Sequence, residues 1–190
     1  PLFEQWMKAG SPTHKVAAVR YWRAVEADEM RLARYLHRFM DAADNQLASR
    51  WEDLLAKPPQ ALQADLSGFP LAARQQLIRK TVQNLARQNI ETAAQQWLAF
   101  RTQLPEESAL RAELDVYVGR RLTFADSENA AGLLVRVDPQ YQYAGITEAR
   151  LVQALGAKQI GWAAIQAMIE RLPDDLKNSD RWRYWYGNAL

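Results

Sequence analysis

The sequence contains no cysteine and only two histidines, His14 and His37. Without cysteine, neither a disulfide framework nor a thiolate zinc site can form, and the redox compartment of the protein is left open. The two histidines stand 23 residues apart and form no H-x-x-x-H pair, so a histidine metal site is not expected either. We therefore predict neither a metal nor a cofactor.

An excess of one charge sign and long apolar runs are also missing. The chain has 24 basic and 22 acidic residues, a formal charge of +2, which gives no electrostatic support for nucleic-acid binding. No apolar run approaches the roughly 18 residues that a membrane span needs, and no leader pattern of a charged and then an apolar segment is present. Both ends lie inside helical patterns, so we expect a fragment of a longer polypeptide, and the missing leader means little.

Motifs for nucleophilic or phosphate chemistry are absent as well. There is no G-x-S-x-G serine turn, and the glycines occur singly in or near helical patterns rather than in a phosphate-cradling loop. Glu106 and Glu107 are adjacent carboxylates, but neighbouring helix residues point about 100° apart and do not face a common cleft. We predict that they mark the start of a helix, where acidic residues are favoured.

What the sequence does contain is helical patterning. Ala, Leu, Gln, Glu and Arg dominate, and apolar residues recur at three and four positions. Pro70, Pro105, Pro139 and Pro173 follow one another at steps of 35, 34 and 34 residues, the length of a helix-turn-helix repeat. The pattern predicts an all-α fold: a right-handed superhelix, or α-solenoid, of stacked helical hairpins with a period near 34 residues, forming one domain over residues 1–190.

The segment 158–172 gives the strongest indication of such an array. Apolar residues cover most of its circumference, which predicts a helix packed on several sides, with Trp162 in the interior as Trp97 is expected to be. We also expect small residues to let neighbouring helices approach closely, namely Ala93, Ala94, Ala163, Ala164 and Ala167. Nearer the N-terminus, Asn45 is expected to cap a helix that ends before Pro58.

Aromatic residues near the C-terminus are the strongest candidates for a binding surface. Trp182, Trp185 and Tyr186 fall at i, i+3 and i+4, so they share one helix face. Such a stripe either packs against the next helix or stacks on sugar rings, and both interpretations stay open. Tyr141 and Tyr143, in the long connector 140–145, are further candidates, because loops carry function but tyrosines also anchor loops.

Two motifs carry a family resemblance. Residues 2–10 read L-F-E-Q-W-M-K-A-G, and Leu172-Pro173 is followed, after a linker, by W-R-Y-W at residues 182–185. The chain resembles the U-shaped superhelical domain of the periplasmic soluble lytic murein transglycosylases. The resemblance implies a periplasmic location, peptidoglycan glycan strands as partners, and a linker domain and a lysozyme-like catalytic domain in the same polypeptide. The parent enzymes cleave the MurNAc-GlcNAc bond and give 1,6-anhydromuramyl products.

The catalytic motif of that family is not in this sequence. The family places its catalytic Glu in an E-S dipeptide followed by a Gly-rich segment that ends in G-L-M-Q. Glu107-Ser108 is the only E-S here, and no G-L-M-Q follows it. The sequence thus favours a non-catalytic scaffold. The alternative is a tetratricopeptide-like adaptor for a protein or peptide, although the W-x-x-L-G-x-x-Y signature of that repeat is missing.

Overall fold

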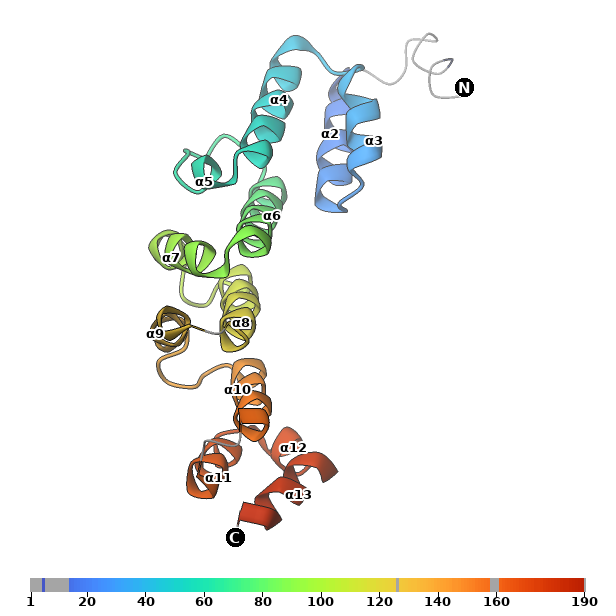
Figure 1. Ribbon diagram of the computed structural model, residues 1–190. Helices are drawn as coiled ribbons and strands as arrows, with labels where there is room; N and C mark the ends of the chain where they lie inside the picture. The colour runs from blue at the N-terminus through green and yellow to red at the C-terminus, as the bar shows by residue number, and fades with distance from the viewer. Residues whose placement is uncertain (1–4, 6–13, 126, 158–160, 190) are drawn as a thin grey trace. The chain divides into compact units, whose positions relative to one another are not determined.

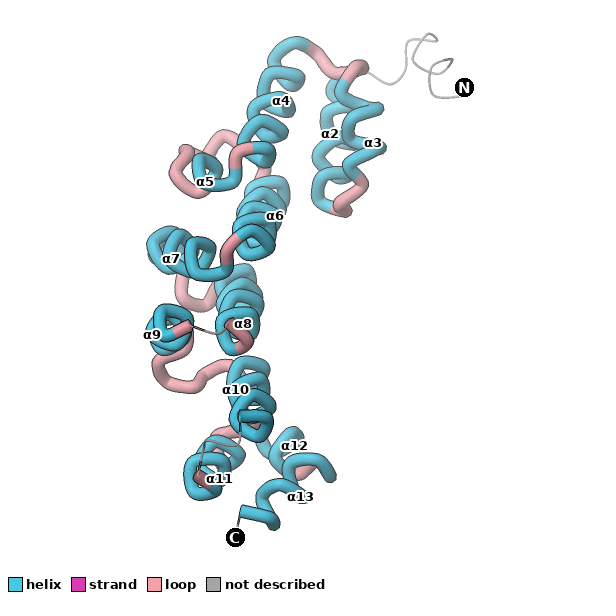
Figure 2. The backbone as a smooth tube through the Cα atoms, in the orientation of Figure 1, coloured by secondary structure: helices cyan, strands magenta, loops and turns pink. Residues whose placement is uncertain are grey.

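The computed structural model of the protein describes residues 5, 14–125, 127–157 and 161–189 (Figure 1). Within these residues the chain is helical and contains no strand, which confirms the all-α prediction (Figure 2). It divides into two compact units, Pro1–Asn84 and Leu85–Leu190. The prediction of one domain over residues 1–190 stays a prediction. Of the motif at residues 2–10, only Gln5 lies within the described residues.

In the described residues the first unit contains four helices and most of a fifth, α6, which ends in the second unit. The helices are α2 (His14–Glu26), α3 (Met30–His37), α4 (Ala42–Ala56), α5 (Pro58–Ala61) and α6 (Leu71–Gln88). The buried Trp51 of α4 donates its indole N–H to the carbonyl of Ala73 in α6, at 2.9 Å. The buried Tyr21 of α2 donates to Glu52 of α4, at 3.1 Å. Aromatic rings with a polar atom therefore join these helices.

The turn between α2 and α3 shows why α2 ends where it does. Asp28 has a φ of 62°, a left-handed conformation that aspartate adopts more readily than most residues. The N–H of Glu29 donates to the carbonyl of Ala24 at 2.8 Å, and the N–H of Asp28 donates to Val25 at 3.2 Å. This pair of bonds forms a Schellman motif, which satisfies the last carbonyls of α2.

The start of α4 differs from the prediction. The side chain of Asp41 accepts a hydrogen bond from the N–H of Asp44 at 2.8 Å, so Asp41 caps the helix. Asn45, the predicted cap, lies within the helix and donates its side-chain amide to the carbonyl of Met40. Its placement was wrong because both residue types are good caps and the sequence pattern alone does not decide between them.

The second unit is a stack of helical hairpins (Figure 1). Its elements are α7 (Ile90–Phe100), the 3-10 helix η1 (Arg101–Gln103), α8 (Ala109–Thr123), α9 (Glu128–Val137), α10 (Ala144–Ala157), α11 (Trp162–Glu170), α12 (Asp174–Lys177) and α13 (Asp180–Ala189). Helix α7 packs on both α8 and α9, and α8 packs on both α9 and α10. Each hairpin thus buries its apolar face against the next one.

Small residues lie at helix contacts of this stack. Ala93 and Ala94 of α7 are fully buried, as predicted. A methyl group added at Gly119 of α8 would collide with the Cδ1 and Cγ1 atoms of Ile146 in α10, so either that side chain or the helix spacing would have to change. Helices α8 and α10 are therefore as close at this point as the Ile146 side chain permits.

The predicted burial of α11 on several sides was wrong. Ile165 and Ile169 are buried, but Trp162 is 48% exposed, and Ala163, Ala164 and Ala167 are exposed too. Within the described residues α11 packs on α10 and α13, which leaves the opposite face uncovered. An apolar helix face can equally be a surface for another molecule, and composition does not separate the two cases.

The two tryptophans give a direct test of this placement. Because Trp97 is fully buried, Trp97→Ala is expected to lower the free energy of unfolding by about 3–5 kcal/mol. The half-exposed Trp162 loses less contact, so Trp162→Ala should cost no more than about 2 kcal/mol. Urea titration followed by circular dichroism measures both values. Equal costs for the two variants would contradict the placement of Trp162.

Candidate functional site

An aromatic surface lies on α11 and α13 in the second unit. We use this name for three side chains, those of Trp162, Tyr184 and Trp185. The rings of Trp162 and Trp185 stack with centroids 6.3 Å apart and planes at 22°. Tyr184 meets Trp185 edge-on at 5.3 Å, and its side chain is 64% exposed. The three rings form an aromatic platform without sharing one plane, and its two most exposed rings, Trp162 and Tyr184, can each stack on a flat apolar ligand face.

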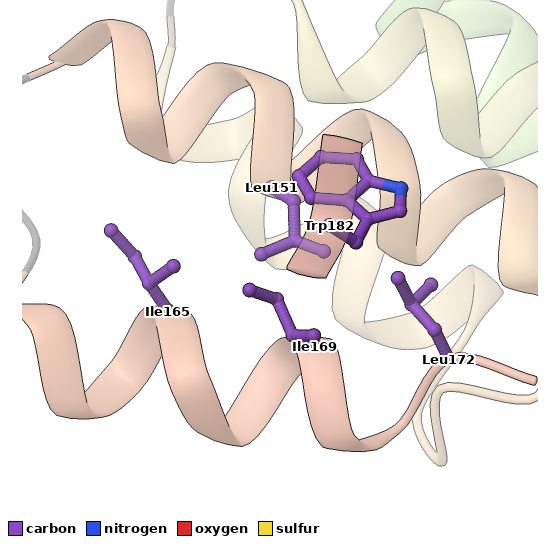
Figure 3. Close-up of a cluster of buried hydrophobic side chains, with 5 residues drawn as sticks. All are labelled: Leu151, Ile165, Ile169, Leu172 and Trp182. Carbon is purple, nitrogen blue, oxygen red and sulfur yellow. The ribbon is translucent and has the colours of Figure 1, made fainter. Parts of the chain in front are cut away.

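Trp182, from the predicted stripe, lies inside the protein instead. Its ring is 1% exposed and packs with Leu151, Ile165, Ile169 and Leu172 (Figure 3). Its indole N–H donates to Glu148 of α10 at 3.3 Å, which satisfies the one polar atom of the ring. Packing, one of the two alternatives drawn from the sequence, therefore describes Trp182. Trp185 and Tyr186 pack against the rim of the same cluster and are half-buried.

Tyr186 belongs to a polar group at the edge of that cluster. Its hydroxyl donates to Glu170 at 3.0 Å and accepts a hydrogen bond from Gln166 at 3.2 Å. A depression of about 420 Å³ adjoins it, lined by Glu170, Lys177, Asn178, Arg183, Tyr186 and Gly187. The hydroxyl and the carboxylate could exchange hydrogen bonds with a sugar or a peptide there.

The loop between α9 and α10 holds Tyr141 and Tyr143 in two different ways. Tyr141 has a φ of 56°, and its ring lies between the guanidinium groups of Arg150 and Arg171, each 4.3 Å from the ring centre. Such cation–π contacts hold the ring against α10 and the end of α11. Tyr143 is half-buried and donates its hydroxyl proton to Asp115 of α8 at 3.0 Å. Both tyrosines therefore fix the loop in place.

Asp115 is the centre of a buried polar network. Its carboxylate is nearly inaccessible and accepts hydrogen bonds from Trp97 at 2.7 Å, Arg101 at 2.8 Å and Tyr143. Arg101 also donates to the backbone carbonyls of Arg136 and Val137, at the end of α9. Burial, together with the negative charge of Asp115, raises the pKa of Tyr143 to about 12. The network joins α7, η1, α8, the end of α9 and the loop before α10.

A second buried carboxyl group, Asp138, lies in the same loop. One of its oxygens accepts the N–H of Gln142 at 2.7 Å, whereas the other is buried and has no hydrogen-bond partner. Burial raises the pKa of Asp138 above its usual range, because the charged form loses its hydration. The group is closed to a substrate, so we assign it to the structure of the loop and not to catalysis.

Other residues considered in the sequence lie elsewhere. Glu107 is exposed in the turn before α8, and Ser108 is the N-terminal cap residue of that helix, so the prediction of a helix start is confirmed. In the first unit, His14 contacts the carbonyl of Phe39 and His37 contacts that of Asn45. The described part of the chain holds no group of three His, Cys, Asp or Glu residues that could bind a metal ion.

Two members of the aromatic surface, Trp162 and Tyr184, were not predicted as site residues. Trp162 was expected in the interior, and Tyr184 lies off the face that Trp182, Trp185 and Tyr186 share. The position of Trp162 directly after the cap residue Gly161 is the one signal in the sequence, because the first turn of a helix has fewer neighbours to cover it. For Tyr184 no local signal exists.

Comparison with known proteins identifies the class that the chain is similar to. No protein-family model matches the sequence, and no curated protein matches it either. Solved structures do match: over its whole length the chain is similar to soluble lytic transglycosylases, as the sequence motifs predicted.

Two such structures are a complex of the 70-kDa soluble lytic transglycosylase with bulgecin A and an inactive mutant of the lytic transglycosylase Slt from Pseudomonas aeruginosa. Each is 26% identical to this chain, with TM-scores of 0.75 and 0.60. The match covers 100% of this chain and 30% of each of those chains.

The network around Asp115 leads to a stability prediction. Asp115→Ala removes the partner of the largely buried Arg101, so we expect the free energy of unfolding to fall by about 3–5 kcal/mol. Asp174→Ala is the matched control, because Asp174 pairs with Lys177 at the surface and its loss should leave the urea midpoint unchanged. Similar midpoints for the two variants would show that the network contributes little.

Asp138 leads to a prediction about pH. The folded protein holds the Asp138 proton more tightly than the unfolded chain does, because the pKa of Asp138 is raised on folding. The stability that this group contributes is therefore fully present below the ordinary carboxyl pKa of about 4 and is lost as the pH rises through the raised pKa. Asp138→Asn keeps an oxygen for the N–H of Gln142 and does not titrate. Relative to the wild type, the variant should therefore gain stability between about pH 4 and pH 7. Thermal unfolding at several pH values measures this difference; a constant difference would refute the assignment.

Proposed function

We propose that this chain is a non-catalytic helical scaffold of a peptidoglycan lytic transglycosylase. In this proposal the parent protein cleaves the MurNAc-GlcNAc bond of murein and gives 1,6-anhydromuramyl products. A lysozyme-like catalytic domain, which follows a linker domain in the same polypeptide, carries out the cleavage. The observation that carries the proposal is the whole-length similarity to two lytic transglycosylase structures at 26% identity.

The residues support a scaffold in preference to an enzyme. A general acid for glycoside cleavage needs a pocket that raises its pKa toward neutrality. Glu107, in the only E-S dipeptide, is exposed in a turn, and the sequence contains no G-L-M-Q. The buried Asp138 is inaccessible to a sugar. The chain would then contribute shape and binding surface, and the bond-breaking chemistry would be performed elsewhere.

The helix pattern supports the superhelix of the proposal. Pro70, Pro105, Pro139 and Pro173 each lie in the connection before a helix, namely α6, α8, α10 and the four-residue α12. In the second unit α7 contacts α9 and α8 contacts α10, so successive hairpins repeat the same neighbour relation. A repeated neighbour relation with a step near 34 residues generates a superhelical array.

Within this scaffold the aromatic surface is the proposed contact with the glycan. Pyranose rings have an apolar face that stacks on indole and phenol rings, and Trp162, Tyr184 and Trp185 present three such rings together. Tyr186, with its hydroxyl and the neighbouring Glu170, adds hydrogen-bonding groups at the edge. Tyr141 is half-exposed between two arginines and is a further point of contact.

A periplasmic location follows from the same proposal, since peptidoglycan lies there. In the part of the chain that the structure describes, no helix combines the length and the apolar composition needed to cross a membrane.

The proposal predicts binding without cleavage. After incubation with purified peptidoglycan sacculi, the chain is expected to sediment with the insoluble fraction, and chromatography with mass spectrometry should detect no 1,6-anhydromuramyl products. Trp162→Ala combined with Tyr184→Ala should reduce the sedimented fraction, because the two most exposed rings of the platform are lost. Val135→Ala changes an equally exposed apolar residue on α9 and serves as the control.

The other outcomes have clear meanings. Anhydromuramyl products from the chain alone would overturn the scaffold assignment. Failure to sediment, together with capture of a protein or peptide partner, would favour the tetratricopeptide-like adaptor instead.

A further inference from the structure

A groove at one edge of the second unit is separate from the aromatic surface. It has a volume of about 660 Å³ and lies between the last turn of α6, the start of α7 and the end of α8. Binding sites for small molecules commonly have volumes of about 300–1,000 Å³. Its lining includes one large exposed aromatic side chain, that of Phe124, together with Arg120, Arg121 and Glu91.

The side chains of the groove fall into two kinds. Phe124, at the C-terminal cap of α8, is 61% exposed, which is unusual for a ring of this size and leaves its face open to a ligand. The guanidinium of Arg120 makes no hydrogen bond or ion pair to any residue that the structure describes. Arg121 donates to the carbonyl of Ala86 in α6 at 3.2 Å, which holds it along the wall of the groove.

The charge of the groove favours an anion. Among the described residues, two arginines and one glutamate line it, and Glu91 accepts a hydrogen bond from Ser127 at 2.5 Å. Basic residues in the last turn of a helix also complement its dipole, but that effect needs neither a groove nor an exposed ring. Arginine binds carboxylates through paired N–H donors, and phenylalanine stacks on the apolar face of a sugar.

We infer that this groove binds a carboxylate-bearing segment of peptidoglycan, with Phe124 against a sugar ring and Arg120 and Arg121 on carboxylates of the peptide stem. The inference rests on the proposed function, because peptidoglycan combines amino-sugar rings with anionic peptides. It adds a second contact with the glycan strand, selective for strands that carry peptide stems. The aromatic surface consists of three rings and includes no arginine, so it would not distinguish such strands from bare glycan.

The test is an NMR titration of the 190-residue chain with a soluble disaccharide-tetrapeptide from murein. Amide signals of Asn89 and Phe124 are expected to shift, and Arg120→Ala or Phe124→Ala should each raise Kd by about fivefold or more. Arg136→Ala and Val135→Ala are the controls, because they remove the same charge and a similarly exposed apolar side chain from α9; both should stay within about twofold of the wild type. All four side chains are exposed, so the variants are expected to fold.

A neutral probe and salt then test the role of the carboxylates. Chitotetraose has similar rings without carboxylates, and the shifts of Asn89 and Phe124 should show at least about tenfold weaker binding at the groove. Added salt should weaken the binding of the disaccharide-tetrapeptide, because ionic contacts at an exposed site are screened. Equal affinity for both probes, or unchanged Kd values for the Arg120 and Phe124 variants, would overturn the inference.

The failure of this inference can be told from failure of the proposed function. If the groove variants bind the disaccharide-tetrapeptide like the wild type while the chain still sediments with sacculi, the groove assignment is wrong and the scaffold proposal stands. If the chain neither sediments with sacculi nor binds the soluble probe, both are wrong.

Discussion

The hydrogen bonds to Asp115 are the interaction on which the second unit most depends. A charge with almost no access to water is tolerated only where donors surround it, and Trp97, Arg101 and Tyr143 supply them from three elements. Arg101 in turn reaches the end of α9. Neighbouring hairpins in a repeat protein touch mainly through apolar faces, which fix distance better than direction. The hydrogen bonds to Asp115 are directional, so they fix how the neighbouring hairpins are oriented relative to one another. They also hold the loop that carries Tyr141 and Tyr143.

In the proposed scaffold, rigid helices with ligand-sized surfaces would suit the holding of a glycan strand without its cleavage. The aromatic surface on α11 and α13 and the groove at the end of α8 both belong to the second unit, and each takes side chains from more than one helix. Side chains on packed helices keep their positions better than those on free loops. Two modest contacts on one strand also bind more tightly than either alone, since the second contact forms at high effective concentration.

Much of the fold could be predicted because its determinants are local. The helices could be predicted from the spacing of apolar residues, which repeats every three or four positions. The four prolines at 70, 105, 139 and 173 mark connections correctly, since proline cannot continue a helix. Burial of Trp97, Ala93 and Ala94 also followed from periodicity. The exposure of Trp162 was missed because an apolar helix face indicates a partner without saying which one. The Asp115 network joins residues up to 36 positions apart, and no local pattern reveals such pairs.

The site was predictable only in part for the same reason. The stripe of Trp182, Trp185 and Tyr186 correctly marked the C-terminal helix as aromatic on one face, yet that face turns Trp182 inward. The exposed ring next to it, Tyr184, lies off the stripe and contacts Trp185 through its edge. Helical periodicity tells which residues share a face, whereas the packing of α11 against α13 decides which face meets water.

The close approach at Gly119 has a consequence for the geometry of the hairpin stack. The side chain of Ile146 in α10 lies against the backbone of Gly119 in α8. At this point the two helices are closer together than they would be with a side chain on both residues. An added methyl there would require either another position of the Ile146 side chain or a wider separation of α8 from α10. The spacing of these two neighbouring helices in the second unit therefore depends on a residue that has no side chain.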